Sequence, residues 1–100
     1  MFILIPMDSE DIEESKLTKL EDVKFWIQLQ IEEGRVVNTL TSTDKDGFEN
    51  FSECIVVIND AEYVWPFMEL SMMVLVAHTQ RYIEDIVEAY IFKELHDLAY

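Results

Sequence analysis

The sequence predicts an α/β domain built on a largely buried mixed sheet, and three observations indicate this fold. Short, continuously apolar runs occupy residues 2–6, 54–58 and 72–76, as is typical of strands covered on both faces. Residues 23–31 alternate between apolar and polar side chains, the pattern of a strand with one buried face. From Ile83 onward the apolar residues follow the spacing of one helical face.

The first half of the chain predicts a strand, an acidic connection and a hairpin. Residues 2–6 (FILIP) form the opening strand, and residues 8–22 are either an ordered loop or a short helix. In the next strand Phe25, Ile27 and Leu29 share one face, whereas Trp26 and Gln28 lie on the other, which we expect to be exposed. The turn Glu32-Glu33-Gly34-Arg35 places glycine where a hairpin needs positive φ. The β-branched residues 36–43 return.

The second half predicts two βαβ units. Residues 44–52 begin as a turn and could close into one or two helical turns before the apolar strand 54–58. A short helix is expected within residues 61–70, with Pro66 in its first turn. After the strand 72–76, an amphipathic helix is expected from Ile83 to the C-terminus. Its apolar face comprises Ile83, Ile86, Val87, Tyr90, Ile91, Leu95 and Leu98. This order implies a single domain, residues 1–100, around a five-stranded mixed sheet with parallel central strands.

Composition restricts the classes of partner. The 21 acidic and 7 basic residues give a net charge of −14, which disfavours nucleic acids and anionic membranes and suits a basic protein partner, bound cations or simple solubility. No apolar run approaches the roughly 20 residues of a membrane span, so the chain is expected to be soluble and cytoplasmic. Cys54 is alone, which excludes an internal disulfide, and its apolar surroundings predict a small buried side chain.

Three stretches resemble the dinitrogenase iron–molybdenum cofactor biosynthesis family. They are an apolar run ending in Pro6-Met7-Asp8, the hairpin ending in Glu32-Glu33-Gly34-Arg35, and the helical run at residues 83–90 (IEDIVEAY). The resemblance implies a three-layer α/β domain of ribonuclease H-like fold. It also implies a non-enzymatic binding or carrier function for iron–sulfur or iron–molybdenum cofactor precursors.

The sequence departs from the family pattern at two places. Family members usually carry a His-Phe-Gly motif shortly before the second strand, where this chain has Lys19-Leu20-Glu21. They also tend to place glycines after the fourth strand, where Asn59 and Asp60 stand here. The resemblance therefore implies a divergent member with a degenerate site, and it assigns Lys19, Asn59 and Asp60 to the positions of that site.

A cation site is one further expectation. In the implied sheet Asp8 follows the first strand, Asp60 the fourth and His78 the fifth, all at one edge. Two carboxylates and an imidazole could hold Mg²⁺ or Mn²⁺, and a third acid from Asp46 or Glu49 would suit a metal-dependent hydrolase. We expect no enzyme, because the chain has no nucleophile motif, no glycine-rich phosphate loop and no basic patch.

A protein interface is the alternative function. Residues 63–73 are rich in large apolar side chains, more than a short helix can cover. We expect a partner to bind through Trp65, Phe67 and Met68, and we predict that Trp65 or Phe67 is substantially exposed. His96 is expected in the last helical turns, where its side chain would complement the helix dipole.

Overall fold

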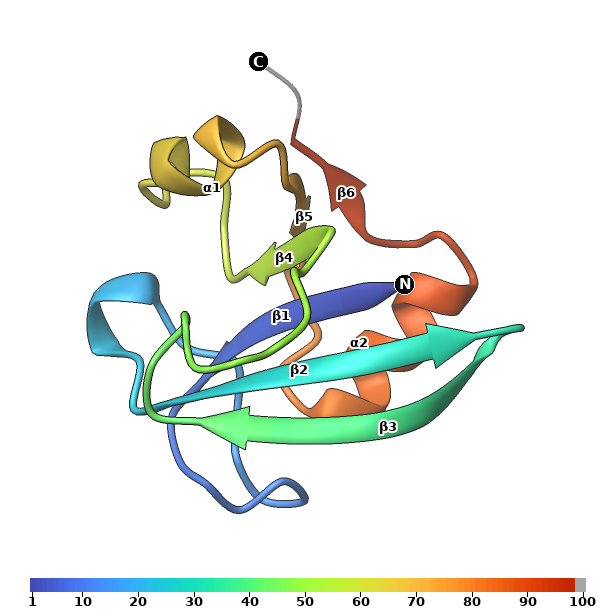
Figure 1. Ribbon diagram of the computed structural model, residues 1–100. Helices are drawn as coiled ribbons and strands as arrows, with labels where there is room; N and C mark the ends of the chain where they lie inside the picture. The colour runs from blue at the N-terminus through green and yellow to red at the C-terminus, as the bar shows by residue number, and fades with distance from the viewer. Residues whose placement is uncertain (99–100) are drawn as a thin grey trace.

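A computed structural model describes residues 1–98, and a six-stranded sheet lies at its centre (Figure 1). The strands follow the order β3-β2-β1-β4-β5-β6; β1, β4 and β5 run parallel, while β2 and β6 are antiparallel to their neighbours. The elements are β1 (Phe2–Met7), the 3-10 helix η1 (Leu20–Asp22), β2 (Phe25–Glu32), β3 (Arg35–Ser42), β4 (Cys54–Val57), α1 (Trp65–Glu69), β5 (Met73–Val76), α2 (Ile83–Ile91) and β6 (His96–Asp97). The α/β class and mixed sheet are confirmed, but the predicted number of five strands is wrong.

The sixth strand exists because α2 ends earlier than predicted. The Lys93 backbone takes a left-handed conformation with φ of 59°. Its N–H donates to the Tyr90 carbonyl at 3.1 Å, and the Glu94 N–H donates to the Ala89 carbonyl at 2.8 Å, which closes the helix. The predicted helix is therefore wrong beyond Ile91 as far as the structure describes the chain, and its last two positions, 99–100, lie outside the described residues.

The two leucines that extended the helical pattern pack on different sides of the sheet. Leu95 packs against the core beneath α2, whereas Leu98 packs against the core beneath α1. Between them His96 and Asp97 pair with β5 as β6. The three-residue spacing of Leu95 and Leu98, which suits one face of a helix, therefore directs the two side chains to opposite faces of the sheet on either side of β6.

Two hydrophobic cores flank the sheet, giving three layers. The core on the α2 side comprises Ile3, Ile5, Met7, Leu17, Ile27, Leu29, Ile31, Cys54, Val56, Leu75, Ala77 and Ile86. The core on the α1 side comprises Leu4, Trp26, Ile55, Val57, Val64, Phe67, Met72, Val74 and Val76. Alternate residues of each central strand feed the two cores, which explains why these strands are apolar throughout.

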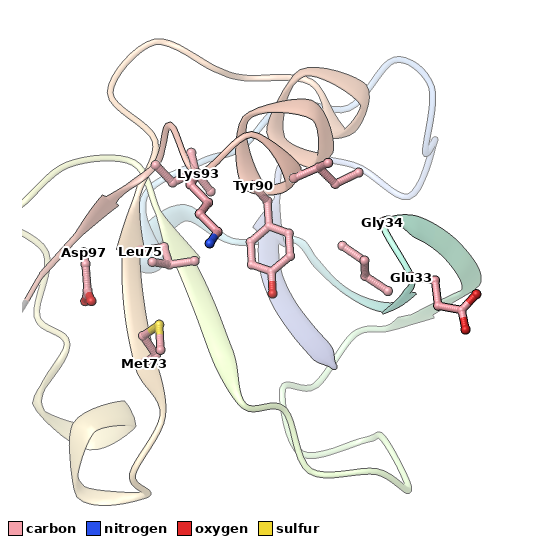
Figure 2. A pocket seen from close by; sticks show the side chains of 10 residues that line it. Glu33, Gly34, Met73, Leu75, Tyr90, Lys93 and Asp97 are labelled. Carbon is pink, nitrogen blue, oxygen red and sulfur yellow. The ribbon is translucent and has the colours of Figure 1, made fainter.

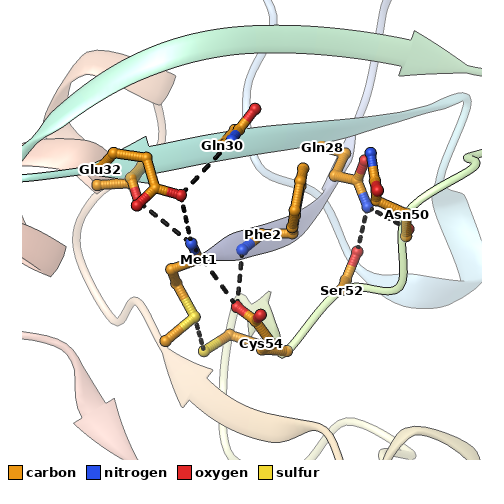
Figure 3. Close-up of polar contacts among 10 residues, drawn as sticks. Met1, Phe2, Gln28, Gln30, Glu32, Asn50, Ser52 and Cys54 are labelled. Atoms are coloured by element: carbon orange, nitrogen blue, oxygen red, sulfur yellow. Dashed lines mark hydrogen bonds and ion pairs between the residues drawn. The ribbon is translucent and has the colours of Figure 1, made fainter.

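Strand β2 is buried on both faces, which corrects the expectation of an exposed polar face. Trp26 is only 6% exposed and packs against Phe67, with 6.3 Å between ring centres. Gln28 is 1% exposed, and its Nε2 donates at 2.8 Å to the Ser52 hydroxyl and to the Asn50 carbonyl (Figure 3). The segment before β4 therefore satisfies the amide nitrogen of the buried Gln28, whereas its Oε1 has no hydrogen-bond partner among residues 1–98.

The hairpin between β2 and β3 turns as predicted. Glu33 and Gly34 both have positive φ, at 52° and 76°, as a two-residue turn of this kind requires. Strand β3 then forms an exposed edge of the sheet. Along this edge the Thr39 N–H donates to the side-chain oxygen of Asn38 at 3.0 Å.

The long connections contain little regular structure. Residues 8–19 form a loop, followed by the single 3-10 turn η1, and Leu17 bridges to Met7 at the end of β1. Residues 43–53 make turns and bends, without the helical turns considered from the sequence. Helix α1 lies inside the predicted segment and has Pro66 in its first turn, as predicted. None of the helices within residues 1–98 has the length and apolar character required to cross a membrane.

Candidate functional site

The predicted site lies at the edge of the sheet where β1, β4 and β5 end, and two of its side chains hold their own loops. The Asp8 carboxylate accepts the Lys16 N–H at 2.8 Å. The Asn59 side-chain oxygen accepts the Ala61 N–H at 2.8 Å. The first bond closes the loop of residues 8–16 and the second fixes a turn, so both side chains stabilise the backbone at this edge.

The remaining predicted site residues do not assemble into a cation site. Asp60 and Lys19 are exposed on separate loops. Asp46 pairs with Lys45 at 3.2 Å on the segment before β4. Within residues 1–98 no three His, Cys, Asp or Glu side chains converge in a way that could hold a metal ion. The three-ligand arrangement of Asp8, Asp60 and His78 is therefore not formed in the described part of the chain.

His78 is instead brought beside His96. The centres of the two rings lie 6.0 Å apart, with 47° between their planes, and both residues are exposed. The prediction that His96 lies in a helix is wrong, because His96 belongs to β6. The sequence could not reveal this pair, since the juxtaposition depends on the end of α2 and on a strand of only two residues.

An apolar cleft opens at the opposite end of the parallel strands (Figure 2). Its volume is about 520 Å³, and it lies between the β2–β3 turn, the start of β5 and the end of α2. The lining residues are Ile31, Glu33, Gly34, Met73, Leu75, Tyr90, Ile91, Lys93, Leu95 and Asp97. Clefts of this size with an apolar floor and a few polar groups are typical of ligand sites.

Two polar groups reach into this cleft from the end of α2. In Figure 2 the Lys93 ammonium lies between Leu75 and Tyr90. Burial raises the pKa of the Tyr90 hydroxyl, and the nearby Cys54 and Glu53 raise it further. The hydroxyl is therefore a neutral hydrogen-bond donor at physiological pH. These residues come from elements distant in sequence, so no local motif could have marked the cleft.

The single thiol of the chain lies beneath the N-terminus and close to the same end of the sheet (Figure 3). Cys54 is 1% exposed, and its Sγ contacts the Met1 Sδ at 4.0 Å. Burial, followed by the negative charges of Glu53 and Asp97, raises the pKa of this thiol to about 11. Cys54 is thus a buried, protonated side chain, which confirms the prediction of its burial.

The N-terminal ammonium fixes the start of β1 above this thiol. It pairs with the Glu32 carboxylate at 3.1 Å and lies 3.9 Å from the Glu53 carboxylate. The hydrogen bond and charge of the ammonium lower the pKa of Glu32. Glu53 also accepts the Phe2 N–H at 2.8 Å. Both acids therefore anchor the end of the sheet.

Comparisons with known proteins identify structural neighbours over the whole chain. No protein-family model matches the sequence, and no curated protein matches it. The crystal structure of PH0822 matches with a TM-score of 0.77 at 16% identity, covering 98% of this chain and 96% of the neighbour. The crystal structure of "a putative dinitrogenase (mj0327)" from Methanocaldococcus jannaschii matches with a TM-score of 0.77 at 19% identity, covering 99% and 95%.

An NMR structure of mj0327 gives the same result, with a TM-score of 0.77, 17% identity and coverage of 100% and 94%. The chain has the fold of these dinitrogenase-like proteins. At such identities the likeness concerns the arrangement of the strands and helices. The α/β domain implied by the family resemblance is confirmed at this level.

Proposed function

We propose that this protein is a small non-enzymatic binding or carrier domain, a divergent relative of the iron–molybdenum cofactor biosynthesis proteins with a degenerate site. The observation that carries the proposal is the match of the complete fold to mj0327, at a TM-score of 0.77 over 99% of the chain. The three sequence stretches that resemble the family fall on β1, the β2–β3 hairpin and α2. The resemblance thus coincides with the elements that frame the sheet.

The local geometry favours binding over catalysis. Asp8 and Asn59 are engaged in turns, and within residues 1–98 the carboxylates do not assemble around a common metal position. A hydrolase of the two-metal type needs such a group of acids. The groups that remain available at this edge, Lys19, Asp60 and His78, suit contact with a cargo molecule.

The residues present do not fit a cluster held by thiolates. Iron–sulfur clusters are usually ligated by several cysteine thiolates, and this chain has one cysteine, whose thiol is buried and protonated. We therefore assign any iron-containing cargo to nitrogen and oxygen donors at the His78 edge. The cargo is carried there and is not a permanent cofactor.

Anaerobic reconstitution tests this proposal. Tag-free protein is incubated with iron and sulfide, desalted, and examined by absorbance and metal analysis. We expect bound iron with charge-transfer absorbance, reduced in His78→Ala and retained in Cys54→Ala. A colourless, metal-free protein after desalting would contradict the carrier function.

A protein-interaction module is the second candidate, favoured by the exposed aromatics at the start of α1. Tyr63 is 71% exposed and Trp65 55% exposed, which confirms the prediction for Trp65, whereas Phe67 is 6% exposed and belongs to the core. A hollow of about 270 Å³ is lined by Glu62, Tyr63, Val64 and Trp65. We therefore propose Trp65, with Met68 at the border of the core, as the partner contact in place of Phe67.

Capture of a basic protein partner tests this second candidate. We expect wild-type protein to retain the partner and Trp65→Ala to lose it. Phe92→Ala is the matched control, because Phe92 is 67% exposed and lies at the end of α2. Equal retention by both variants would exclude the α1 surface.

A further inference from the structure

We propose that His78 and His96 together bind one divalent transition-metal ion of the zinc, nickel or copper(II) class. The site is separate from the cleft. It shares His78 with the edge assigned to the cargo of the proposed function, but it requires neither a cluster nor that cargo. It is defined by two side chains that are 18 residues apart in sequence and adjacent in the structure.

The sheet register places both imidazoles on the same side. His96 pairs directly with Val76 across the β5–β6 ladder. His78 follows Val76 by two residues, which makes it the diagonal neighbour of His96 on the same face of an antiparallel pair. Ring side chains at diagonal positions can reach one another, and here they do so with 6.0 Å between ring centres.

The distance suits one shared ion. Imidazole nitrogens bind zinc at about 2.1 Å, so two rings that share an ion have centres no more than roughly 6.5 Å apart. The observed 6.0 Å lies within this limit. Both side chains are exposed, so no core packing opposes the rotation that would direct one nitrogen of each ring to a common point.

The backbone beneath both histidines is held in place. The Arg81 guanidinium donates to the Ala77 and His78 carbonyls at 3.0 Å and to the Gln80 carbonyl at 2.8 Å. On the other side, the Leu98 N–H donates to the Val74 carbonyl at 2.9 Å, which ties down the end of β6. The backbone that carries both ligands is thus fixed before an ion arrives, which lowers the ordering cost of binding.

The chemistry of the donors selects the metal. Within residues 1–98 the rings of His78 and His96 contact each other and have no hydrogen bond or ion pair. Neutral imidazole suits zinc, copper and nickel, whereas magnesium and calcium require oxygen ligands. Two protein donors leave the other coordination positions to water, so the ion is open to exchange. The net charge of −14 raises the local concentration of cations.

The two histidines are the only ones in the chain, which makes the test direct. Tag-free protein is titrated with zinc and with magnesium, following heat by calorimetry and the imidazole ring protons by NMR. We expect one zinc per chain, with both imidazole signals shifting together, and no response to magnesium. His78→Gln and His96→Gln should each weaken zinc binding by roughly tenfold or more. Glu69→Gln is the matched control and should leave the affinity unchanged, because Glu69 is an exposed acid at the end of α1.

A zinc response in only one imidazole would overturn the inference. Either glutamine variant binding zinc as tightly as the wild-type protein would also overturn it and would assign zinc to other surface groups. Circular dichroism of each variant checks that the overall fold is retained. The two proposals fail separately. Protein that retains iron and sulfide but ignores zinc refutes only the histidine site, and protein that binds zinc but stays colourless refutes only the carrier function.

Discussion

The two ends of the parallel strands are organised in different ways. At the end where β1, β4 and β5 finish, polar side chains such as Asp8 and Asn59 bond to the backbone of their own loops. At the opposite end, Leu75, Ile31 and Tyr90 from three elements surround an apolar cleft of about 520 Å³. The first end is organised locally, whereas the second depends on the whole fold.

This difference shows that an acidic side chain at a strand end is weak evidence for a binding site in such an acidic chain. The chain has 21 acids in 100 residues, so a carboxylate that follows a strand is as readily explained by a role in a turn as by a role in a binding site. A residue that contributes to the cleft must be correctly placed by long-range packing. Substitutions at the two ends should therefore differ in their effect on stability.

The largest expected effect contrasts Leu75→Ala with Asp60→Asn. Leu75 is 7% exposed and belongs to the core beneath α2, so truncation should lower the free energy of unfolding by roughly 2–5 kcal/mol. Asp60 is exposed on a loop, so its neutralisation should change stability by less than about 0.5 kcal/mol. Urea unfolding of both variants measures this contrast. Similar losses would mean that both ends are integrated into the core.

The second expected effect is a loss of stability at alkaline pH caused by Cys54. Folding raises the pKa of its thiol from 9.0 to about 11. The native state therefore holds this proton more tightly, and the stabilisation is complete below pH 9 and is lost as pH rises from about 9 to about 11. We expect a decrease on the order of 1 kcal/mol across this range, measured by urea unfolding.

Cys54→Ala is the control for this pH dependence. It should be less stable at pH 8 because a buried side chain is shortened, but it should lose less stability between pH 9 and 11. Tyr90 still titrates in the variant, and its raised pKa acts in the same direction. An identical alkaline slope in the two proteins would exclude Cys54 as the cause.

The smallest expected effect comes from Lys93→Gly at the end of α2. Lys93 has φ of 59°, a conformation that costs a side-chain-bearing residue about 1 kcal/mol and costs glycine little. Glycine should therefore stabilise the protein by roughly 0.5–1 kcal/mol, raising the midpoint of thermal unfolding. Phe92→Gly is the control and should destabilise, because Phe92 has φ of −88°. A loss of stability in Lys93→Gly would show that the contacts of the Lys93 side chain in the cleft outweigh the relief of its backbone conformation.

The central strands were predictable because burial on both faces leaves a direct trace in the sequence. The runs around Ile3, Ile55 and Val74 contain no polar position, and each became a strand. The turn at Gly34 was predictable because positive φ has a residue signature. These features are local, so pattern reasoning reaches them.

The errors arose where tertiary contacts decide the outcome. Lys93 ends α2 in a conformation for which glycine would have been the recognisable signal. Gln28 looked solvent-facing in an alternating strand, yet Ser52 and Asn50 provide its hydrogen bonds from a distant segment. The pairing of His78 with His96 and the cleft depend on these same long-range arrangements. The sequence marked His78 as a candidate site residue, but it did not indicate that the fold brings His96 beside it.

The hydrogen bond between Asn38 and Thr39 has a consequence for how copies of this protein meet. Strand β3 is eight residues long, β-branched and open to solvent, the kind of edge that can join the sheet of another molecule. A neighbouring strand that pairs at Thr39 must first displace the Asn38 side chain from its N–H. It must also bring a second net charge of −14 alongside the first. The Asn38 carboxamide and the negative charge together therefore oppose pairing of β3 with a strand of another molecule, and with it the growth of fibres from this edge.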